Sequence, residues 1–92
     1  MQLTVEFLGL SRQLAGCRES QLQLEDAADF FDVLRHLATV FPALLGPIIL
    51  PETYRLAPSY MINIDGRRVV RSLDAQPQDG QRLIFMFMEA GG

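Results

Sequence analysis

The chain has 92 residues, of which 49% are hydrophobic and 21% charged, and its formal net charge is -3. This length fits one small domain, and the composition is typical of a globular protein rather than a disordered one. The sequence has neither a run of roughly 20 apolar residues nor a basic cluster interleaved with aromatic residues, so we expect no membrane span and no nucleic-acid binding.

Few side chains in the sequence suit catalysis or metal binding. Cys17 is the single cysteine, which excludes an internal disulfide and a CxxC redox motif, and His36 is the single histidine. All eight basic residues are arginines. Because the chain has no lysine amine, copies of it cannot be joined to one another through lysine side chains. The first residues lack the basic start and apolar core of a secretory signal, so we expect a cytoplasmic protein.

The first predicted elements are two strands. Residues 1–8 alternate between apolar and polar side chains, which indicates a half-buried strand. Residues 11–18 are interpreted as a polar loop, and residues 20–24 as a second strand that forms a hairpin with the first. The apolar positions of the first strand are Leu3, Val5 and Phe7.

An amphipathic helix is predicted after this hairpin, because apolar residues recur there at intervals of three and four. Asp29 suits its N-cap, Asp32 adds negative charge to its first turn, and Pro42 marks its end. One helix therefore covers one face of the sheet. Its apolar positions are Phe30, Val33, Leu34, Leu37, Ala38 and Phe41.

The second half of the chain is predicted to consist mainly of strands. Residues 43–58 are rich in proline and glycine and are interpreted as a long connection with at most a short helical turn or strand. Residues 59–64 and 67–71 flank the dipeptide Asp65–Gly66, which is typical of a two-residue hairpin turn. A last strand, residues 81–88, completes the order strand, strand, helix, strand, strand, strand.

The most informative feature is the stretch Glu89, Ala90, Gly91, Gly92 directly after the last strand. A glycine pair has no Cβ and great backbone freedom, so ordering it costs entropy that a purely structural segment has no reason to incur. We predict a flexible tail, residues 89–92, that extends up to roughly 13 Å into a narrow site of a partner. The alternative is a frayed end without function.

The last strand is apolar on both sides, and only one side can lie beneath the helix. We assign the side with the phenylalanines to the core and the other side, beside Leu8, to an adaptable partner-binding patch. In the alternative, the 43–58 connection buries both sides. The predicted core set is Leu83, Phe85 and Phe87. The predicted patch is Leu8, Ile84, Met86 and Met88, with Arg67, Arg68 and Arg71 as a cationic rim.

This order of elements with a closing diglycine resembles the ubiquitin-like β-grasp, and within it the MoaD/ThiS-type sulfur carriers, especially the small subunit of molybdopterin synthase. The resemblance extends over nearly the whole chain and includes residues 7–16 (FLGLSRQLAG), Asp65–Gly66 with Val69, Leu73, Asp79–Gly80 and Gly91–Gly92. The chain departs from the family pattern at Gln13, which replaces an acidic residue, in its long 43–58 connection, and at Met88–Glu89, where many members carry prolines.

The resemblance implies an α+β fold, a mixed sheet of about five strands on one main helix, in a single domain covering residues 1–92. It also implies a carrier rather than an enzyme. An E1-like partner would adenylate Gly92 with ATP, and sulfur transfer would give a thiocarboxylate that donates sulfur to molybdopterin, the molybdenum or tungsten cofactor, on the synthase large subunit. Gly91 keeps the tail narrow, and Glu89 and Ala90 contact the partner. The chain itself binds no cofactor or metal.

Several other functions remain open at this stage. The same tail chemistry serves carriers for thiamine, tRNA thiolation or cysteine synthesis, so only the accepting partner distinguishes them. A ubiquitin-like modifier would instead join Gly92 to lysines of other proteins by isopeptide bonds. A plain β-grasp binding module would keep its full activity without Gly92.

Overall fold

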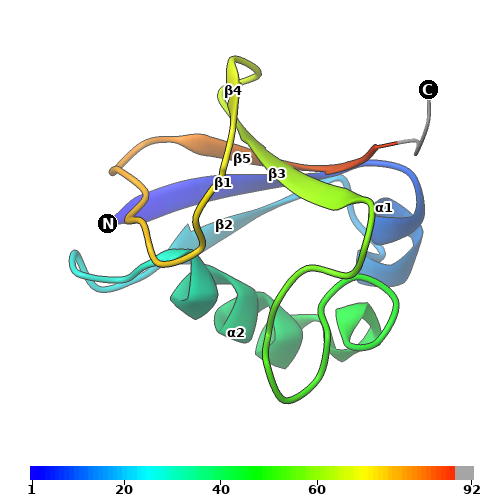
Figure 1. Ribbon diagram of the computed structural model, residues 1–92. Helices are drawn as coiled ribbons and strands as arrows, with labels where there is room; N and C mark the ends of the chain where they lie inside the picture. The colour runs from blue at the N-terminus through cyan, green and yellow to red at the C-terminus, as the bar shows by residue number, and fades with distance from the viewer. Residues whose placement is uncertain (89–92) are drawn as a thin grey trace.

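The computed structural model describes residues 1–88 as one five-stranded sheet with a helical layer on one of its faces (Figure 1). The strands are β1 (Gln2–Phe7), β2 (Glu19–Gln23), β3 (Tyr60–Ile64), β4 (Arg68–Val69) and β5 (Arg82–Phe87). Their order in the sheet is β2-β1-β5-β3-β4. This is the mixed sheet on one main helix that the sequence predicts, and the ubiquitin-like β-grasp class is confirmed.

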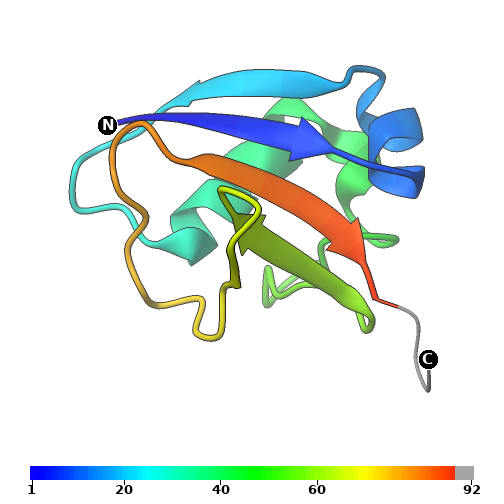
Figure 2. The same cartoon turned by 90° about the horizontal axis from the view of Figure 1, so that it is seen from above.

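The first and last strands lie side by side in the centre of the sheet and run in the same direction (Figure 2). Their parallel register pairs Val5 with Leu83 and Phe7 with Phe85. The three other pairings, β1 with β2, β3 with β4 and β3 with β5, are antiparallel. Because β5 is hydrogen-bonded on both edges, its C-terminal end leaves the sheet at a fixed point between β1 and β3.

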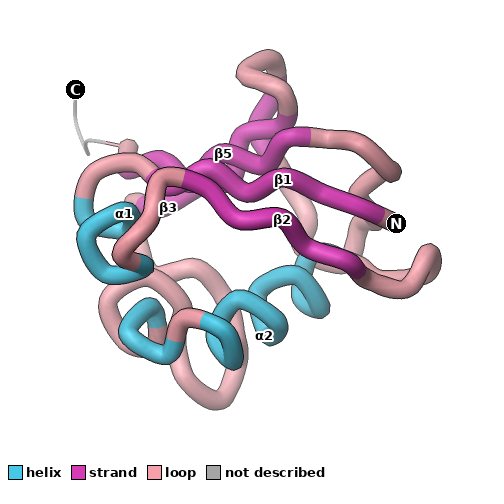
Figure 3. The backbone as a smooth tube through the Cα atoms, turned by 180° about the vertical axis from the view of Figure 1, so that it is seen from behind, coloured by secondary structure: helices cyan, strands magenta, loops and turns pink. Residues whose placement is uncertain are grey.

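The main helix, α2 (Phe30–Val40), packs beneath the sheet and is followed by a short 3-10 turn, η1 (Pro42–Leu44) (Figure 3). The predicted N-cap is confirmed, because the Asp29 carboxylate accepts a hydrogen bond from the Asp32 amide at 2.9 Å. Asp32 does more than add charge, since its own carboxylate accepts from the Asp29 amide at 3.0 Å. This reciprocal capping box satisfies two amides at the helix start.

The prediction of a polar loop at residues 11–18 is wrong, because the structure has a helix there, α1 (Leu10–Ala15). The buried Ser11 hydroxyl donates to the Leu8 carbonyl at 2.8 Å and accepts from the Leu8 amide, which fixes the turn that enters the helix. Gly16 ends the helix in the left-handed region, at φ 77°, where glycine carries no Cβ penalty. A helix of six residues is too short to show a periodic apolar pattern.

The core lies between the sheet and α2. Apolar side chains of β1, β3 and β5 meet those of α2, and Ile48 and Ile49 from the 43–58 connection are fully buried among them. The connection thus packs on the helical side of the sheet, with Leu50 only partly buried. The largest fully buried side chains include Phe7, Phe30, Phe85, Leu3, Leu34, Leu37 and Ile62.

The predicted turn between β3 and β4 is confirmed, because Asp65 and Gly66 both have positive φ, 55° and 71°. Positive φ at both central residues is the requirement of a type I′ turn. Strand β4 is only two residues long, so this edge of the sheet is short. Within residues 1–88, no helix has the length and apolarity that a membrane span requires.

Candidate functional site

The predicted reactive group lies outside the described residues. Glu89, Ala90, Gly91 and Gly92 are not part of the structural description, so their roles stay predictions. What the structure does define is the base from which they follow. Figure 2 shows that β1 and β5 both point to the same end of the sheet, where the chain continues from β1 into α1. The backbone amide of Met88 donates to the Ser59 carbonyl, which ties the end of β5 to the start of β3.

Of the three core residues predicted from the alternation along β5, two are buried in the structure. Leu83 and Phe85 are buried, and the Phe85 ring lies 5.9 Å from the Phe7 ring. The prediction for Phe87 is wrong, because 59% of this residue is exposed. Phe87 has the same place in the alternation as Leu83 and Phe85, but it is the last residue of the strand. Its ring packs edge-on against the Tyr60 ring, with the ring centroids 5.2 Å apart, instead of packing against α2.

The opposite face of the sheet carries an apolar patch near the end of β5. Met88 is 55% exposed and Leu8 41% exposed, while Ile84 and Met86 are partly buried. The structure adds Met61, which lies opposite Met86 in the β3–β5 register and was not predicted. The alternation in residues 60–64 could have identified it, because Met61 falls between the inward residues of that strand. We call Leu8, Met61, Ile84, Met86 and Met88 the apolar patch.

The alternative in which the 43–58 connection buries both faces of β5 does not hold. Ile48 and Ile49 of that connection belong to the core on the helical side of the sheet. The apolar patch therefore remains accessible on the outer face. A surface of partly exposed methionines can adapt to the shape of a protein partner, because the side chain is unbranched and polarizable.

An ion-pair network borders the apolar patch on the same outer face. The Arg82 guanidinium on β5 lies 2.9 Å from the Glu6 carboxylate on β1 and 2.8 Å from the Glu19 carboxylate on β2. Its hydrogen bond to Glu19 and the negative charge of both glutamates raise the pKa of Arg82 above its usual value. The three side chains link three adjacent strands, although a solvent-exposed network of this kind adds little stability.

The arginines of the predicted cationic rim lie across β5 from the ion-pair network, in the β3–β4 hairpin and directly after it. Arg67, Arg68 and Arg71 are all exposed. Figure 1 shows that the hairpin tip rises from the outer side of the sheet, away from α2. The outer face thus combines an apolar patch, an ion-pair network and a basic hairpin.

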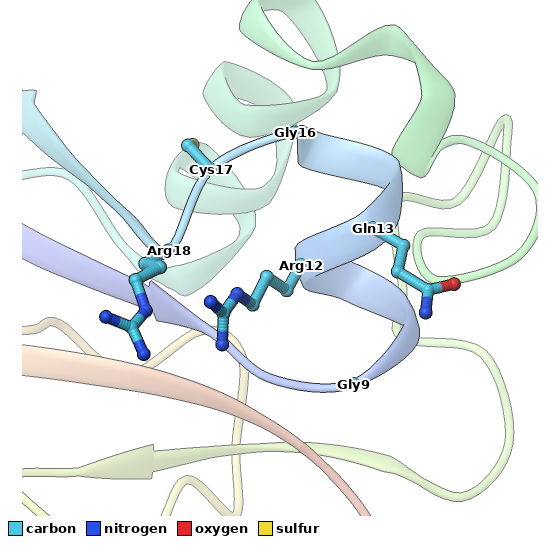
Figure 4. Close-up of a pocket in the computed structure, with 6 residues that line it drawn as sticks. All are labelled: Gly9, Arg12, Gln13, Gly16, Cys17 and Arg18. Atoms are coloured by element: carbon cyan, nitrogen blue, oxygen red, sulfur yellow. The ribbon is translucent and has the colours of Figure 1, made fainter.

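A second basic region surrounds α1. Arg12 and Arg18 extend toward the same side of a shallow hollow of about 550 Å³, with the Cys17 thiol on its rim (Figure 4). Cys17 is half-buried and free. No group of three or more metal-ligating side chains gathers anywhere in residues 1–88.

No protein-family model matches this sequence, and no curated protein sequence matches it either. Solved structures do match over almost the whole chain. Small archaeal modifier protein 1 (SAMP1) from Haloferax volcanii has a TM-score of 0.84 at 18% identity, with 100% of each chain covered. SAMP1 from Methanosarcina acetivorans has a TM-score of 0.77 at 26% identity, covering 99% of this chain and 96% of that one.

A putative molybdopterin converting factor, subunit 1, from Pyrococcus furiosus also shares the fold. Its TM-score is 0.77 at 21% identity, and the match covers 97% of this chain and 99% of that chain. These neighbours confirm the ubiquitin-like β-grasp fold that the sequence indicates.

Proposed function

We propose that this chain is a ubiquitin-like sulfur carrier that donates sulfur in molybdopterin biosynthesis. In the proposed cycle a Gly92 carboxylate oxygen attacks the α-phosphorus of ATP, and pyrophosphate leaves. A hydrosulfide equivalent from a sulfur donor then attacks the acyl carbon, and AMP leaves. The resulting thiocarboxylate holds a soft nucleophilic sulfur that attacks an electrophilic carbon of a cofactor precursor. Water then cleaves the bond between the Gly92 acyl carbon and the sulfur, which leaves the sulfur on the precursor and restores the Gly92 carboxylate, so the chain acts as a co-substrate.

The observation that carries this proposal is the shared fold with the Pyrococcus subunit over nearly the whole length of both chains. The position of β5 supports it, because a central strand held on both edges by β1 and β3 gives residues 89–92 a rigid base. The tail can then extend into a partner's active site while the folded body stays outside. Glycine at 91 and 92 suits this path, because a Cβ there would widen the tail.

The proposal assigns the catalytic side chains to the partners. An E1-like adenylating enzyme would bind ATP, and the molybdopterin synthase large subunit would bind the pterin intermediate, with this chain as the small subunit. The apolar patch would hold either partner, since burying apolar surface is the main source of affinity in protein association. We place these steps in the cytoplasm, where ATP is available.

A second candidate, a protein modifier, is favoured by the likeness to the two SAMP1 structures. In that case the activated Gly92 carbonyl would be attacked by a lysine amine of another protein, and an isopeptide bond would form. The chain has no lysine, so it could modify other proteins but not build chains on itself. Sulfur delivery to thiamine, tRNA or cysteine would use the same thiocarboxylate with a different accepting partner.

Intact mass spectrometry tests the proposal. The full chain with an N-terminal tag is incubated with the cognate activating enzyme, ATP and a sulfur donor. We expect a species heavier by the exchange of one oxygen for one sulfur, and conversion of the pterin precursor when the synthase large subunit is added. The matched control carries the tag after Gly92, where the carboxylate becomes an internal amide and no loading is expected.

The outcomes separate the candidates. Loading with sulfur but no pterin conversion would assign the chain to another sulfur pathway. Adducts on lysines of other proteins without any thiocarboxylate would favour the modifier. If neither product forms with an activating enzyme that loads its usual substrate, the carrier proposal is wrong.

A further inference from the structure

A second recess lies at the edge of the sheet formed by β4. The β1–β2 hairpin and α1 lie at the opposite edge. It has a volume of about 700 Å³ and lies along the short edge strand and the residues that follow it. Because β4 is only two residues long, side chains from the hairpin and from the next loop line the same space. The polar side chains around it are Asn63, Arg67, Arg68, Arg71, Ser72 and Gln76.

The arginines of this recess have no acidic partner in residues 1–88. The ion pairs of the described chain involve the N-terminus, Arg35 and Arg82. Nearby carboxylates are engaged elsewhere: Asp65 accepts from the Arg82 amide at 2.8 Å, and Asp74 accepts from the Ser72 hydroxyl. In a chain with eleven acidic and eight basic residues, three adjacent unpaired guanidinium groups form a local positive surface.

A ligand for this recess must supply carboxylates or other anions to these arginines, because a guanidinium group offers only hydrogen-bond donors. The Asn63 side-chain oxygen nearby is buried and accepts no hydrogen bond from residues 1–88, so it is closed to a ligand.

We propose that this recess binds an acidic peptide segment of a partner protein. Glutamate or aspartate carboxylates pair with Arg67, Arg68 and Arg71, because the planar guanidinium matches a carboxylate in two-point geometry. The inference rests on the proposed function, since it names the chemistry by which a partner holds the body of the carrier beside the apolar patch.

The position of the recess favours an acidic peptide over other anions. A peptide segment of a partner protein would continue the contact proposed for the apolar patch on the same outer face, whereas a free polyphosphate would not. A nucleic acid would extend over the outer face, where Glu6 and Glu19 lie, and the net charge of -3 opposes it. A short acidic peptide matches the positive charge of the recess.

The test is a titration of the isotopically labelled full chain, followed by amide and arginine Nε–H resonances. The probes are an octaglutamate peptide, an octaglutamine peptide, tripolyphosphate and a single-stranded RNA 12-mer, at low and at high salt. We expect octaglutamate to shift the resonances of residues 63–72, with binding weakened at high salt. We expect no saturable shifts there from octaglutamine.

Charge reversal supplies the controls. Arg67→Glu/Arg68→Glu/Arg71→Glu should weaken octaglutamate binding by about tenfold or more. Arg12→Glu/Arg18→Glu/Arg55→Glu carries the same net charge and should leave binding at the hairpin within about twofold. Amide spectra of each variant check that it remains folded. A third variant, Arg67→Lys/Arg68→Lys/Arg71→Lys, should weaken binding less than the reversal does.

The inference is overturned if octaglutamate shifts no residue of the hairpin, or if it binds around Arg12 and Arg18 instead. It is also overturned if tripolyphosphate or RNA binds the recess more tightly than the peptide. None of these results depends on Gly92. Failure here would leave sulfur loading intact, whereas failure of the carrier proposal would appear only in the mass measurement.

Discussion

At the scale of single residues, Phe85 carries the clearest structural prediction. It is 1% exposed, lies opposite Phe7 in the β1–β5 register and packs against its ring. Phe85→Ala removes a buried aromatic ring and leaves a cavity, so we expect the free energy of unfolding to fall by about 3 to 5 kcal/mol. This is a large share of the stability of a small domain, and urea unfolding followed by circular dichroism measures it.

Met86, the next residue, points to the outer face and should respond in the opposite way. Met86→Arg places a charge in the apolar patch, where solvent can still reach it, so we expect little change in stability. Affinity for the activating enzyme or the synthase large subunit should fall, because the charge would be desolvated in the complex. Calorimetric titration with each partner measures this. A folded variant that binds both partners normally would remove the patch from the proposed interface.

The residue scale also shows where alternation stops being informative. The pattern identifies Leu83 and Phe85 as inward-facing because every second side chain of a strand shares a face. The pattern fails at Phe87 because alternation gives the face on which a side chain lies, but not whether the helical layer extends far enough to cover it. The alternation of residues 60–64 places Met61 on the outer face, but only its pairing with Met86 shows that it belongs to the apolar patch.

At the scale of elements, the long patterns were predictable and the short ones were not. Eleven residues of α2 with a capping box give a clear signal, and so does the Asp65–Gly66 turn. Helix α1 gives none, because it is defined by the Ser11 hydrogen bonds and by the backbone of Gly16. The split of residues 42–58 into η1 and an irregular connection depends on core contacts of Leu44, Ile48 and Ile49.

The end of α1 gives a prediction at this scale. Gly16 has φ 77°, and a Cβ built there would meet no atom within 4 Å. Gly16→Ala should therefore lower the free energy of unfolding by about 1 to 2 kcal/mol, through backbone strain alone. Gly16→Asn is the matched variant, because asparagine tolerates this region better, and it should cost less. Equal losses for the two variants in urea unfolding would show that strain is not the cause.

For the whole molecule, the patterns in the sequence predict which strands exist but not which are neighbours. The parallel pairing of β1 with β5 joins residues about eighty positions apart, and nothing local in either strand specifies it. The resemblance to the β-grasp implied a mixed sheet but did not name the parallel pair. The outer surface is also a property of the whole chain, because the apolar patch and the basic hairpin come from segments at both ends of the sequence.

The function of the molecule as a carrier depends on the shape of the tail as well as its charge. Gly91→Val keeps the carboxylate of Gly92 and does not touch the described core, so we expect the melting temperature to change little. Sulfur loading should be lost, because a β-branched residue restricts the backbone and widens the tail inside a partner's channel. Gly91→Ala is the graded control and should retain more loading than valine does.

Deleting Gly92 tests the reach of the same tail. The reacting carbon would move back by about 3.5 Å, which is beyond the tolerance of a positioned reacting group. We expect adenylation and sulfur loading to be lost in the intact-mass assay, while the folded body still binds its partner through the apolar patch. If either tail variant loads sulfur and supports pterin conversion normally, the glycine pair has no role in transfer. The binding-module alternative would then be the better account, because the folded surface alone would carry the activity.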